Sequence, residues 1–431
     1  MVTTENIQKE TVMKTFISVG LLVLLLSVGG TSWAANTHAV TTLDYQPWYE
    51  PAGLTIDVGD TVTWSNPSVH TVTDYKLLTT GKPDFHKVML PGESFSYTFT
   101  SAGEWDYLCA LHPWMQGKII ARPGRVSPVK KGEIWVAAQF QNSIQIIDPK
   151  TDTVVDAIHV GNNPHNIWFT PDGRYAYVTS WHEDEIWKID VKLRTVLKKI
   201  EVGPAPAHVY VNPQGDKVYT TVMGSNYITV IDGKTDTVIG KIETGAGPHG
   251  FWPTPDWKYF VVADSHAADA SVVDIAQGKT IARIPTGVVP LGSGVTPDGK
   301  KAYIGNGISG TVSVLDLTTM KKIKDLKVGG MPVQTPVNHK YNYAVVPNKL
   351  LGVAHIVDTV RDVVVKDVPT AHGAHGADFS PDDRYAYVTN TFDNTTTKID
   401  LEKFTTTQIK MWGGPNTSGG QGVTVLKVTP K

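Results

Sequence analysis

The chain has 431 residues, which is enough for two or three domains, and 39 basic against 41 acidic residues give a formal net charge of −2. This near-neutral balance offers no basic surface of the kind that binds nucleic acid or anionic lipid. With 9% aromatic and 19% charged residues the composition is that of an ordinary globular protein, and the single cysteine excludes an intrachain disulfide.

The first 34 residues (1–34) have the pattern of a secretory signal peptide. Two lysines precede an apolar run at 16–28, and Ser32 and Ala34 fit the −3 and −1 positions of a signal-peptidase site. The apolar run is short for a membrane span, so no stable span is expected after cleavage, with an uncleaved N-terminal anchor as the alternative. We expect a mature chain that begins at Ala35 and is periplasmic or extracellular.

The stretch at 107–117 brings three metal-ligand side chains into one short loop: Cys109, His112 and Met115. A thiolate, an imidazole and a thioether suit copper far better than magnesium or calcium. A fourth ligand is expected from upstream, and His70 is the candidate. Two histidines and a cysteine in a plane, with a long axial methionine, form a blue-copper electron-transfer site whose metal deprotonates the thiol. The sequence therefore predicts one type 1 copper site from these four residues.

Two segments, 64–71 and 103–117, resemble the cupredoxins, and the run at 109–115 looks most like the short ligand loop of amicyanins. The resemblance implies a small Greek-key β-sandwich over 38–122 that holds copper and passes single electrons to or from a redox partner. Thr71 departs from the family, because related proteins often carry Asn at that place. The hydrogen bond that supports the sulfur is therefore unassigned at this stage.

The residues around His112 predict where electrons enter. Pro113 and Trp114 flank this histidine and would surround its exposed edge with an apolar patch on which a redox partner protein docks. In this interpretation Cys109 supplies the covalent electron path, and Met115 tunes the metal weakly from the axial position.

Proline, glycine and charge without periodicity mark residues 123–132 as a linker. From residue 133 onward the chain repeats every 42 residues, most visibly in aspartates that end an apolar run. A period near 40 with short alternating strands and no helical pattern predicts a propeller of four-stranded blades, and seven aspartates predict seven blades. They are Asp148, Asp190, Asp232, Asp274, Asp316, Asp358 and Asp400.

The ends of the repeat region predict how the ring closes. The first repeat opens at 133–137 without an innermost strand, and the chain ends with a spare strand at 422–428. Pairing these two strands would remove the free edges of the sheets. The segments 177–180 and 387–390 resemble the Tyr-Val-Thr-Asn propeller repeat family, which implies a seven-bladed propeller over 133–431 and is specific for fold rather than function.

Seven of the 14 histidines fall on one predicted face of the propeller, some at the mouth of its central channel: His165, His182, His208, His249, His266, His372 and His375. Three of them, His165, His249 and His375, share one repeat position, and His208 lies one residue beyond it. One interpretation is a second, histidine-ligated metal site with additional copper, because several imidazoles converging on an axis would suit copper. The chain would then be a copper oxidoreductase acting on a small-molecule substrate at the propeller face.

That pairing of domains resembles nitrous oxide reductase, in which a seven-bladed propeller holds a histidine-ligated copper cluster close to a cupredoxin domain. Here, however, the cupredoxin comes first, and one cysteine replaces the two that a binuclear centre needs. The competing interpretation is that Pro-His is an ordinary repeat residue which packs near the channel without metal. The propeller would then be a non-catalytic docking platform for a redox partner.

Several other chemistries are excluded by the sequence. It has no Cys-x-x-Cys-His motif for c-type haem, and no Gly-x-Ser-x-Gly, phosphate loop or Rossmann fingerprint in a suitable context. The sequence thus predicts an exported all-β copper protein, a cupredoxin Greek-key β-sandwich followed by a seven-bladed β-propeller. Whether it is an enzyme is left open between the two interpretations of the propeller.

Overall fold

The computed structural model describes residues 35–42, 49–101, 103–122, 129–412 and 419–430. The predicted signal peptide at 1–34 and most of the predicted linker lie outside the described residues. Within the described part of the chain, no helix is long and apolar enough to cross a membrane.

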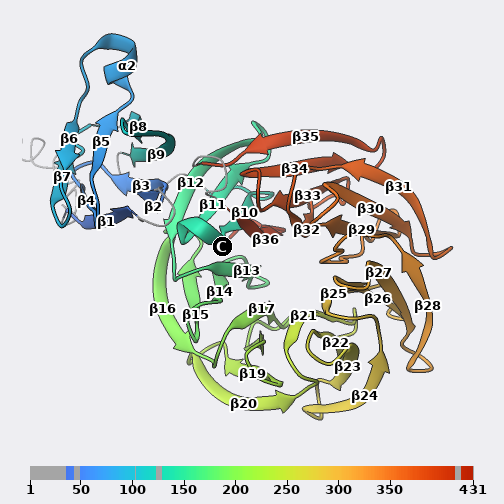
Figure 1. Cartoon of the computed structure of the whole chain (residues 1–431). Helices are drawn as coiled ribbons and strands as arrows, with labels where there is room; N and C mark the ends of the chain where they lie inside the picture. Colours follow the sequence, from blue (N-terminus) through green and yellow to red (C-terminus); the bar gives the residue numbers. More distant parts are fainter. Residues whose placement is uncertain (1–34, 43–48, 102, 123–128, 413–418, 431) are drawn as a thin grey trace, which may run out of the picture. The chain divides into compact units, whose positions relative to one another are not determined.

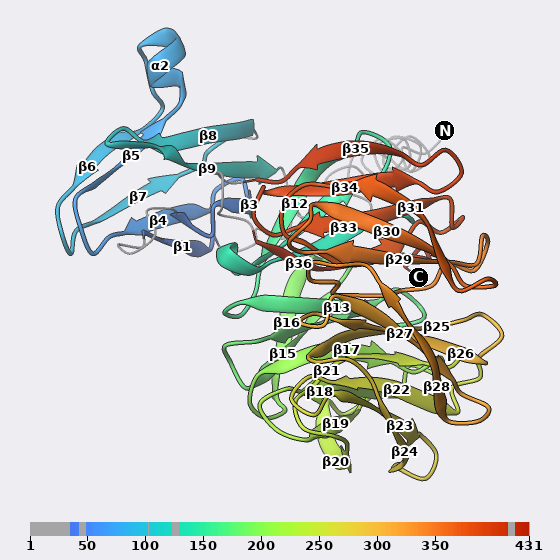
Figure 2. The same ribbon diagram turned by 45° about the vertical axis from the view of Figure 1, so that its right-hand side comes forward.

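Nine strands between residues 37 and 122 form two sheets (Figure 2). One sheet has the order β2-β1-β4-β7 and the other the order β3-β9-β8-β5-β6. The strands are β1 (Thr37–Thr42), β2 (Tyr49–Glu50), β3 (Gly53–Asp57), β4 (Thr61–Ser65), β5 (His70–Asp74), β6 (His86–Met89), β7 (Ser94–Thr98), β8 (Gly103–Cys109) and β9 (His112–Arg122). A short helix, α2 (Lys76–Thr80), follows β5 and projects away from both sheets (Figure 2).

Alternating apolar side chains build the core of this sandwich. In β4 the residues Val62 and Trp64 are fully buried, while the threonines and the serine between them are half-exposed, as expected for a strand with one face on the core. The ring of Trp64 packs edge-on against Tyr107 and is stacked on Phe95. Cys109 belongs to the same buried cluster, so the sandwich core extends up to the predicted metal ligands.

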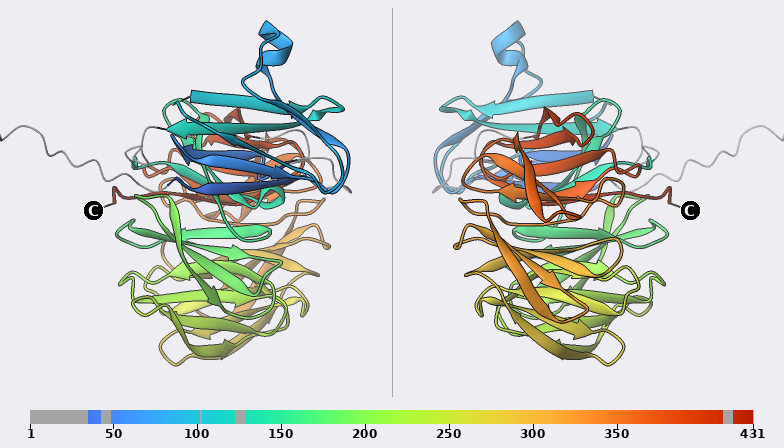
Figure 3. Two further views of the ribbon diagram at one scale, coloured as in Figure 1. Left: turned by 90° about the vertical axis from the view of Figure 1, so that its left-hand side faces the viewer. Right: turned by 90° about the vertical axis from the view of Figure 1, so that its right-hand side faces the viewer.

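The remaining strands form seven sheets arranged as a ring around a central channel (Figure 1). Figure 3 shows the same blades edge-on. The complete blades, from the innermost strand outward, are as follows: β36 (Gly420–Val425), β10 (Ile134–Ala138), β11 (Ser143–Asp148), β12 (Thr153–His159); β13 (Pro164–Phe169), β14 (Tyr175–Ser180), β15 (Glu185–Asp190), β16 (Thr195–Glu201); β17 (Pro206–Val211), β18 (Lys217–Val222), β19 (Tyr227–Asp232), β20 (Thr237–Glu243); β21 (Pro248–Pro253), β22 (Tyr259–Asp264), β23 (Asp269–Asp274), β24 (Lys279–Pro285); β25 (Pro290–Val295), β26 (Lys301–Asn306), β27 (Thr311–Asp316), β28 (Lys321–Lys327); β32 (Ala374–Phe379), β33 (Tyr385–Asn390), β34 (Thr395–Asp400), β35 (Thr405–Lys410).

One blade departs from the predicted four strands. It contains β29 (Tyr343–Asn348), β30 (Val353–Asp358) and β31 (Val363–Pro369), and its innermost segment makes only isolated bridges, from Pro332 to Asn348 and from Val337 to Ala344. The prolines of this segment explain the difference, because proline cannot donate a ladder hydrogen bond.

The ring closes as the sequence predicts, by antiparallel pairing of β36 with β10. Each of the seven repeated aspartates is the last residue of the third strand of its blade. The carboxylate of Asp232, for example, accepts the backbone N–H groups of Lys234 and Thr235. The repeated aspartates therefore cap tight turns, which is the usual use of Asp at such places.

The innermost strands bulge where the repeated histidines stand. The register shifts between Pro164 and Ile167 in β13, and corresponding shifts occur in β17, β21 and β32. A bulge leaves residues without a ladder partner and re-aims their side chains. The two residues inside each of these bulges are the ones closest to the predicted channel site.

Candidate metal centre

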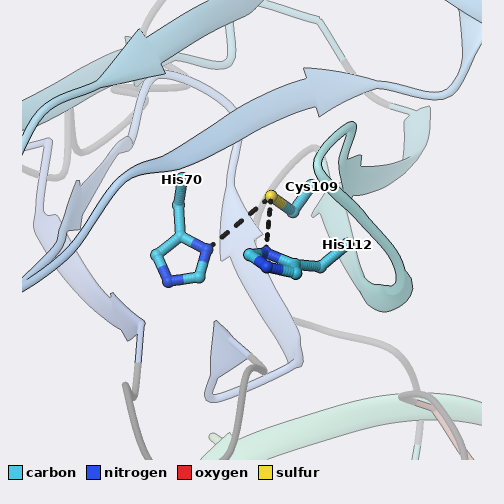
Figure 4. A group of neighbouring side chains, drawn as sticks. All are labelled: His70, Cys109 and His112. Carbon is cyan, nitrogen blue, oxygen red and sulfur yellow. Dashed lines mark hydrogen bonds between the residues drawn. The ribbon is translucent and has the colours of Figure 1, made fainter.

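Three of the four predicted copper ligands come together at one end of the sandwich. His70 is the first residue of β5, Cys109 is the last of β8, and His112 is the first of β9. The strands β5, β8 and β9 are neighbours in one sheet, and a bulge between Leu108 and Cys109 brings Cys109 opposite His112. The loop is short enough that the cysteine and the second histidine are held by the same hairpin (Figure 4).

The distances in this cluster fit a metal ion. The Sγ atom of Cys109 lies 3.7 Å from Nδ1 of His70 and 3.6 Å from Nδ1 of His112. Bond lengths of about 2.3 Å to sulfur and about 2.0–2.1 Å to nitrogen, at a trigonal angle near 120°, would place sulfur and nitrogen about 3.7 Å apart. Both histidines therefore stand where ligands of one shared ion would stand.

The surroundings of the cluster hold its members in place. Cys109 is fully buried, His70 is buried and His112 is half-buried. The hydroxyl of Ser68 lies 2.9 Å from Nε2 of His70, which leaves Nδ1 as the ring nitrogen that faces the sulfur. Met115 is fully buried in the same core cluster as Cys109, in keeping with its predicted axial position.

Thr71 supplies the hydrogen bonds that the sequence leaves unassigned. Its backbone N–H donates to Sγ of Cys109 over 3.3 Å, and its Oγ1 accepts the N–H of Ala110 over 2.6 Å. Thr73 donates to the same Oγ1 over 3.2 Å. A threonine thus connects the first ligand strand to the ligand loop. Its position directly after His70 was the available signal, but the pairing depends on how β5 and β8 meet.

Apolar side chains surround the half-buried His112. Its ring lies 5.4 Å from the ring of Trp114 and 5.1 Å from that of His70. Trp114 is 56% exposed and Leu111 is 54% exposed, which is unusual for large apolar side chains. Leu90, next to the strand partner of His70, is also exposed. We call Leu90, Leu111, Pro113 and Trp114 the apolar patch.

The propeller histidines separate into two groups. Four of them, His165, His208, His249 and His375, are buried and in mutual contact, with ring centroids 5.0 Å apart for His165 and His249 and 5.2 Å for His208 and His249. His165 also lies 5.5 Å from His208 and from His375. Nitrogen atoms of His165, His208 and His249 lie within 4.8 Å of one another. We call these four residues the channel histidines.

The other three predicted members do not join this group. His182, His266 and His372 are exposed, and Nδ1 of His372 lies 2.8 Å from the carboxylate of Asp393. His182 and His266 stand in hairpin loops between the second and third strands, and His372 precedes β32, whereas the channel histidines lie in the bulges of innermost strands. The seven-residue metal site is therefore corrected to four.

Burial changes the proton affinity of the channel histidines. The pKa of His249 is lowered to about 4 by removal of its ring from water, an effect that its backbone partner Leu291 opposes. Desolvation, with the neighbouring imidazoles, also holds the pKa values of His165, His208 and His375 well below the ordinary value. All four rings are thus neutral at neutral pH.

The fold and the site together define a β-propeller protein with a cupredoxin-like sandwich at its N-terminal side. The chain belongs to the YNCE-like beta-propeller family, whose model matches residues 50–340. The matched range begins inside the sandwich and stops before the last blades, whereas the propeller strands run from Ile134 to Val425. We place the propeller by its strands, because hydrogen-bonded sheets define the blades directly.

Curated relatives match the sandwich. The chain is 40% identical over 78 residues to amicyanin from Paracoccus denitrificans, 39% over 70 residues to amicyanin from Paracoccus versutus, and 35% over 86 residues to chloroplastic plastocyanin from Tetradesmus obliquus. The matches cover 16–17% of this chain and 52–58% of the relatives. The chain thus spans about half the length of the curated relatives it matches.

Solved structures match the propeller fold. A Kuenenia stuttgartiensis hydrazine synthase chain has a TM-score of 0.56 at 22% identity, covering 65% of this chain and 92% of that one. A functionally unknown protein from Desulfotomaculum acetoxidans has a TM-score of 0.59 at 15% identity, covering 68% and 98%. The dihydro-heme d1 dehydrogenase NirN has a TM-score of 0.55 at 15% identity, covering 70% and 77%. At these identities the likeness concerns fold alone.

Proposed function

We propose that the sandwich binds one copper ion through His70, Cys109, His112 and Met115, and that the protein transfers single electrons through this site. The observation that carries the proposal is the pair of sulfur-to-nitrogen distances, 3.7 Å and 3.6 Å, in a buried cluster of one thiol and two imidazoles. The similarity to amicyanins and plastocyanin over this segment supports the same ligand chemistry. When bound, copper would supply a one-electron redox couple.

The protein's own contribution is to hold the ligands so that they do not move between redox states. Ser68 orients the ring of His70, and Thr71 donates its N–H to the sulfur. An N–H that donates to a thiolate stabilises the negative charge on sulfur, which is one of the means by which proteins tune such sites. The fully buried Cys109 and Met115 keep water away from the ligands.

The apolar patch supports a docking role for the edge of His112. Its side chains are large, exposed and uncharged, which suits a partner that must approach closely without a fixed set of hydrogen bonds. We propose that a redox partner protein docks there and exchanges electrons through the imidazole of His112. The direction of electron flow is set by the partner.

We further propose that the protein is exported and has two domains. The proposal assigns a signal peptide to 1–34, the copper domain to 38–122, a linker to 123–132 and the propeller to 133–431. It is supported by the charge and apolar pattern of the first segment and by the break between β9 and β10. The protein would then act in a periplasm or outside the cell.

Copper loading of the full chain tests the electron-transfer proposal. Wild-type protein oxidised with cupric ion should show an intense visible absorption from thiolate-to-copper charge transfer, and a Cys109→Ser variant should lack it. His182→Ala, which changes an exposed histidine of the propeller, is the matched control and should keep the band. A colourless wild-type protein after loading, or an unchanged band in the serine variant, would overturn the proposal.

A further inference from the structure

The four channel histidines come from four different blades and converge on one point. They are carried by β13, β17, β21 and β32, and their relative exposures are between 1% and 5%. Trp181 lies against them, with its ring 4.4 Å from that of His165 and 5.5 Å from that of His249. Residues 42 or more apart in sequence thus form one buried cluster of imidazoles, outside the sandwich site.

Hydrogen bonds to the next blade orient three of these rings. Nδ1 of His165 lies 3.0 Å from the carbonyl oxygen of Ala207, that of His249 lies 2.6 Å from Leu291, and that of His375 lies 3.3 Å from Gln421. A carbonyl oxygen can only accept, so each Nδ1 carries the proton and donates it. In a neutral imidazole this leaves Nε2 as an acceptor with a free lone pair.

The acceptor nitrogens lack partners among the described residues. Nε2 of His165 and Nε2 of His208 are buried without a hydrogen bond. A buried polar atom without a partner costs about 1–3 kcal/mol, so native proteins rarely keep two of them side by side. Lone pairs that face one another are satisfied by a Lewis acid between them, and the nitrogens of His165, His208 and His249 lie close enough, within 4.8 Å, to share one.

We propose that the channel histidines form a second metal site, bound through Nε2 atoms, and that its ion is copper(I). Imidazole nitrogen suits copper and zinc among the available cations. The charge of the surroundings decides between them. The cluster consists of neutral rings, and the charged group that acts on His249 and His375 is the ammonium of Lys349. Because the desolvation cost of an ion rises with the square of its charge, such a site favours a monovalent ion over zinc(II).

Metal binding by the full-length Cys109→Ser protein tests this site independently of the sandwich. That background removes the thiolate ligand of the first site, so a failure of the electron-transfer proposal does not affect the result. Copper(I), supplied under reducing conditions with a coloured competing chelator, should bind at about one ion per chain. X-ray absorption of the bound copper should show nitrogen neighbours and no sulfur.

The informative variants replace His165 and His249 together with asparagine. The Asn side-chain amide occupies the place of Nδ1 and can still donate to the carbonyls of Ala207 and Leu291, while Nε2 is removed, so the inner strands keep their hydrogen bonds. Copper(I) binding should fall below about 0.1 ion per chain, with an unchanged circular dichroism spectrum. The matched control, His182→Asn with His266→Asn, changes two exposed histidines and should retain full binding.

Three outcomes would overturn the inference. No copper(I) beyond the chelator's own binding in the Cys109→Ser protein would exclude the site. Equal binding by the His165→Asn/His249→Asn variant and its control would place the ion elsewhere. Zinc(II) that binds at one ion per chain and prevents copper(I) from entering would overturn the assignment of the ion.

Discussion

The backbone N–H of Thr71 donates a hydrogen bond to the sulfur of Cys109, although 38 residues separate the two. The Oγ1 atom of the same threonine accepts the N–H of Ala110 over 2.6 Å. The residue after the first candidate ligand therefore holds both the cysteine and the start of the loop that carries His112. This pairing fixes the distance between β5 and the ligand loop before any metal binds.

Replacing Thr71 with valine should loosen the ligand loop. Valine keeps the shape and the backbone N–H but leaves the N–H of Ala110 without its acceptor, a loss of about 1–3 kcal/mol. The amide of Ala110 should then exchange with deuterium about 5- to 150-fold faster, which mass spectrometry of the peptide around residue 110 would measure. Thr71→Ser retains the hydroxyl and should exchange as the wild type does. Equal protection in the valine variant would mean that this bond does not hold the loop.

Charging the apolar patch should slow electron transfer between protein molecules. In a mixture of oxidised and reduced copper-loaded protein, Leu111→Lys would place like charges at the contact of two patches, and self-exchange should slow by about tenfold or more. The visible absorption should not change, because Leu111 is 54% exposed and not a ligand. NMR line broadening measures the exchange rate.

The control for the patch places the same charge at the other end of β5. Leu78 lies on α2, which follows the end of that strand opposite to His70, and it is 64% exposed. A Leu78→Lys variant should therefore exchange electrons at a rate close to the wild type. If both lysine variants slow self-exchange equally, net charge rather than the patch is responsible.

Alanine at Gly294 should destabilise the propeller. A Cβ atom at this position of β25 would stand 1.8 Å from the carbonyl oxygen of Thr335 in the neighbouring blade, so the two inner segments would have to separate. Overpacking of this kind costs about 1–3 kcal/mol or more. Thermal unfolding should show a lower midpoint for Gly294→Ala.

Gly240 on the outer strand β20 is the matched control for that substitution. A Cβ there meets no atom within 4 Å, so Gly240→Ala should be neutral or stabilise the fold by about 0.4–1 kcal/mol. Similar midpoints for the two alanine variants would show that the blades tolerate separation.

Asp264 should make the stability of the propeller fall as pH rises. Burial raises the pKa of this carboxyl group, which stands opposite Asp269 and accepts the hydroxyl hydrogen of Ser271 over 2.6 Å. The folded state therefore holds a proton that the unfolded chain has already lost above about pH 3.9. Stability is fully present below that pH and is lost with increasing pH, at most by about 1.4 kcal/mol per unit, until the folded pKa is passed.

Asp264→Asn tests this directly, because its amide can donate where the proton stood. The variant should gain stability relative to the wild type on going from pH 6 to pH 9, measured by thermal unfolding at both values. Asp256→Asn is the control: its carboxylate has a lowered pKa and is ionised at both values, so its difference from the wild type should not change with pH. A constant difference for Asp264→Asn as well would contradict the assignment.

The fold was largely predictable because its signals are local and repeated. The 42-residue period of the aspartates predicts the seven blades, and the spare strand after residue 420 predicts the closure with β10. The blade that contains β29 was predicted with four strands but has three, since Pro332 and Pro336 prevent a regular innermost ladder. That interruption is visible in the sequence once proline is weighed against the repeat.

The sandwich site was predictable as a set of residues but not as a structure. The spacing of Cys109, His112 and Met115 indicates the chemistry, because a short loop keeps its side chains together whatever the rest of the chain does. The role of Thr71 depends on the pairing of β5 with β8, which no local pattern specifies. Whether the copper set is occupied as predicted stays a prediction.

The sequence by itself determined the period of the propeller and the identity of the soft ligands, since both follow from residue type and spacing along the chain. Only the tertiary structure decided which histidines meet. His165 and His182 belong to the same blade, yet one lies buried in an inner bulge and the other is exposed in a hairpin loop. Closing the ring brings the inner bulges of different blades to one axis, and convergence on an axis is a property of the closed ring, which a single repeat does not contain.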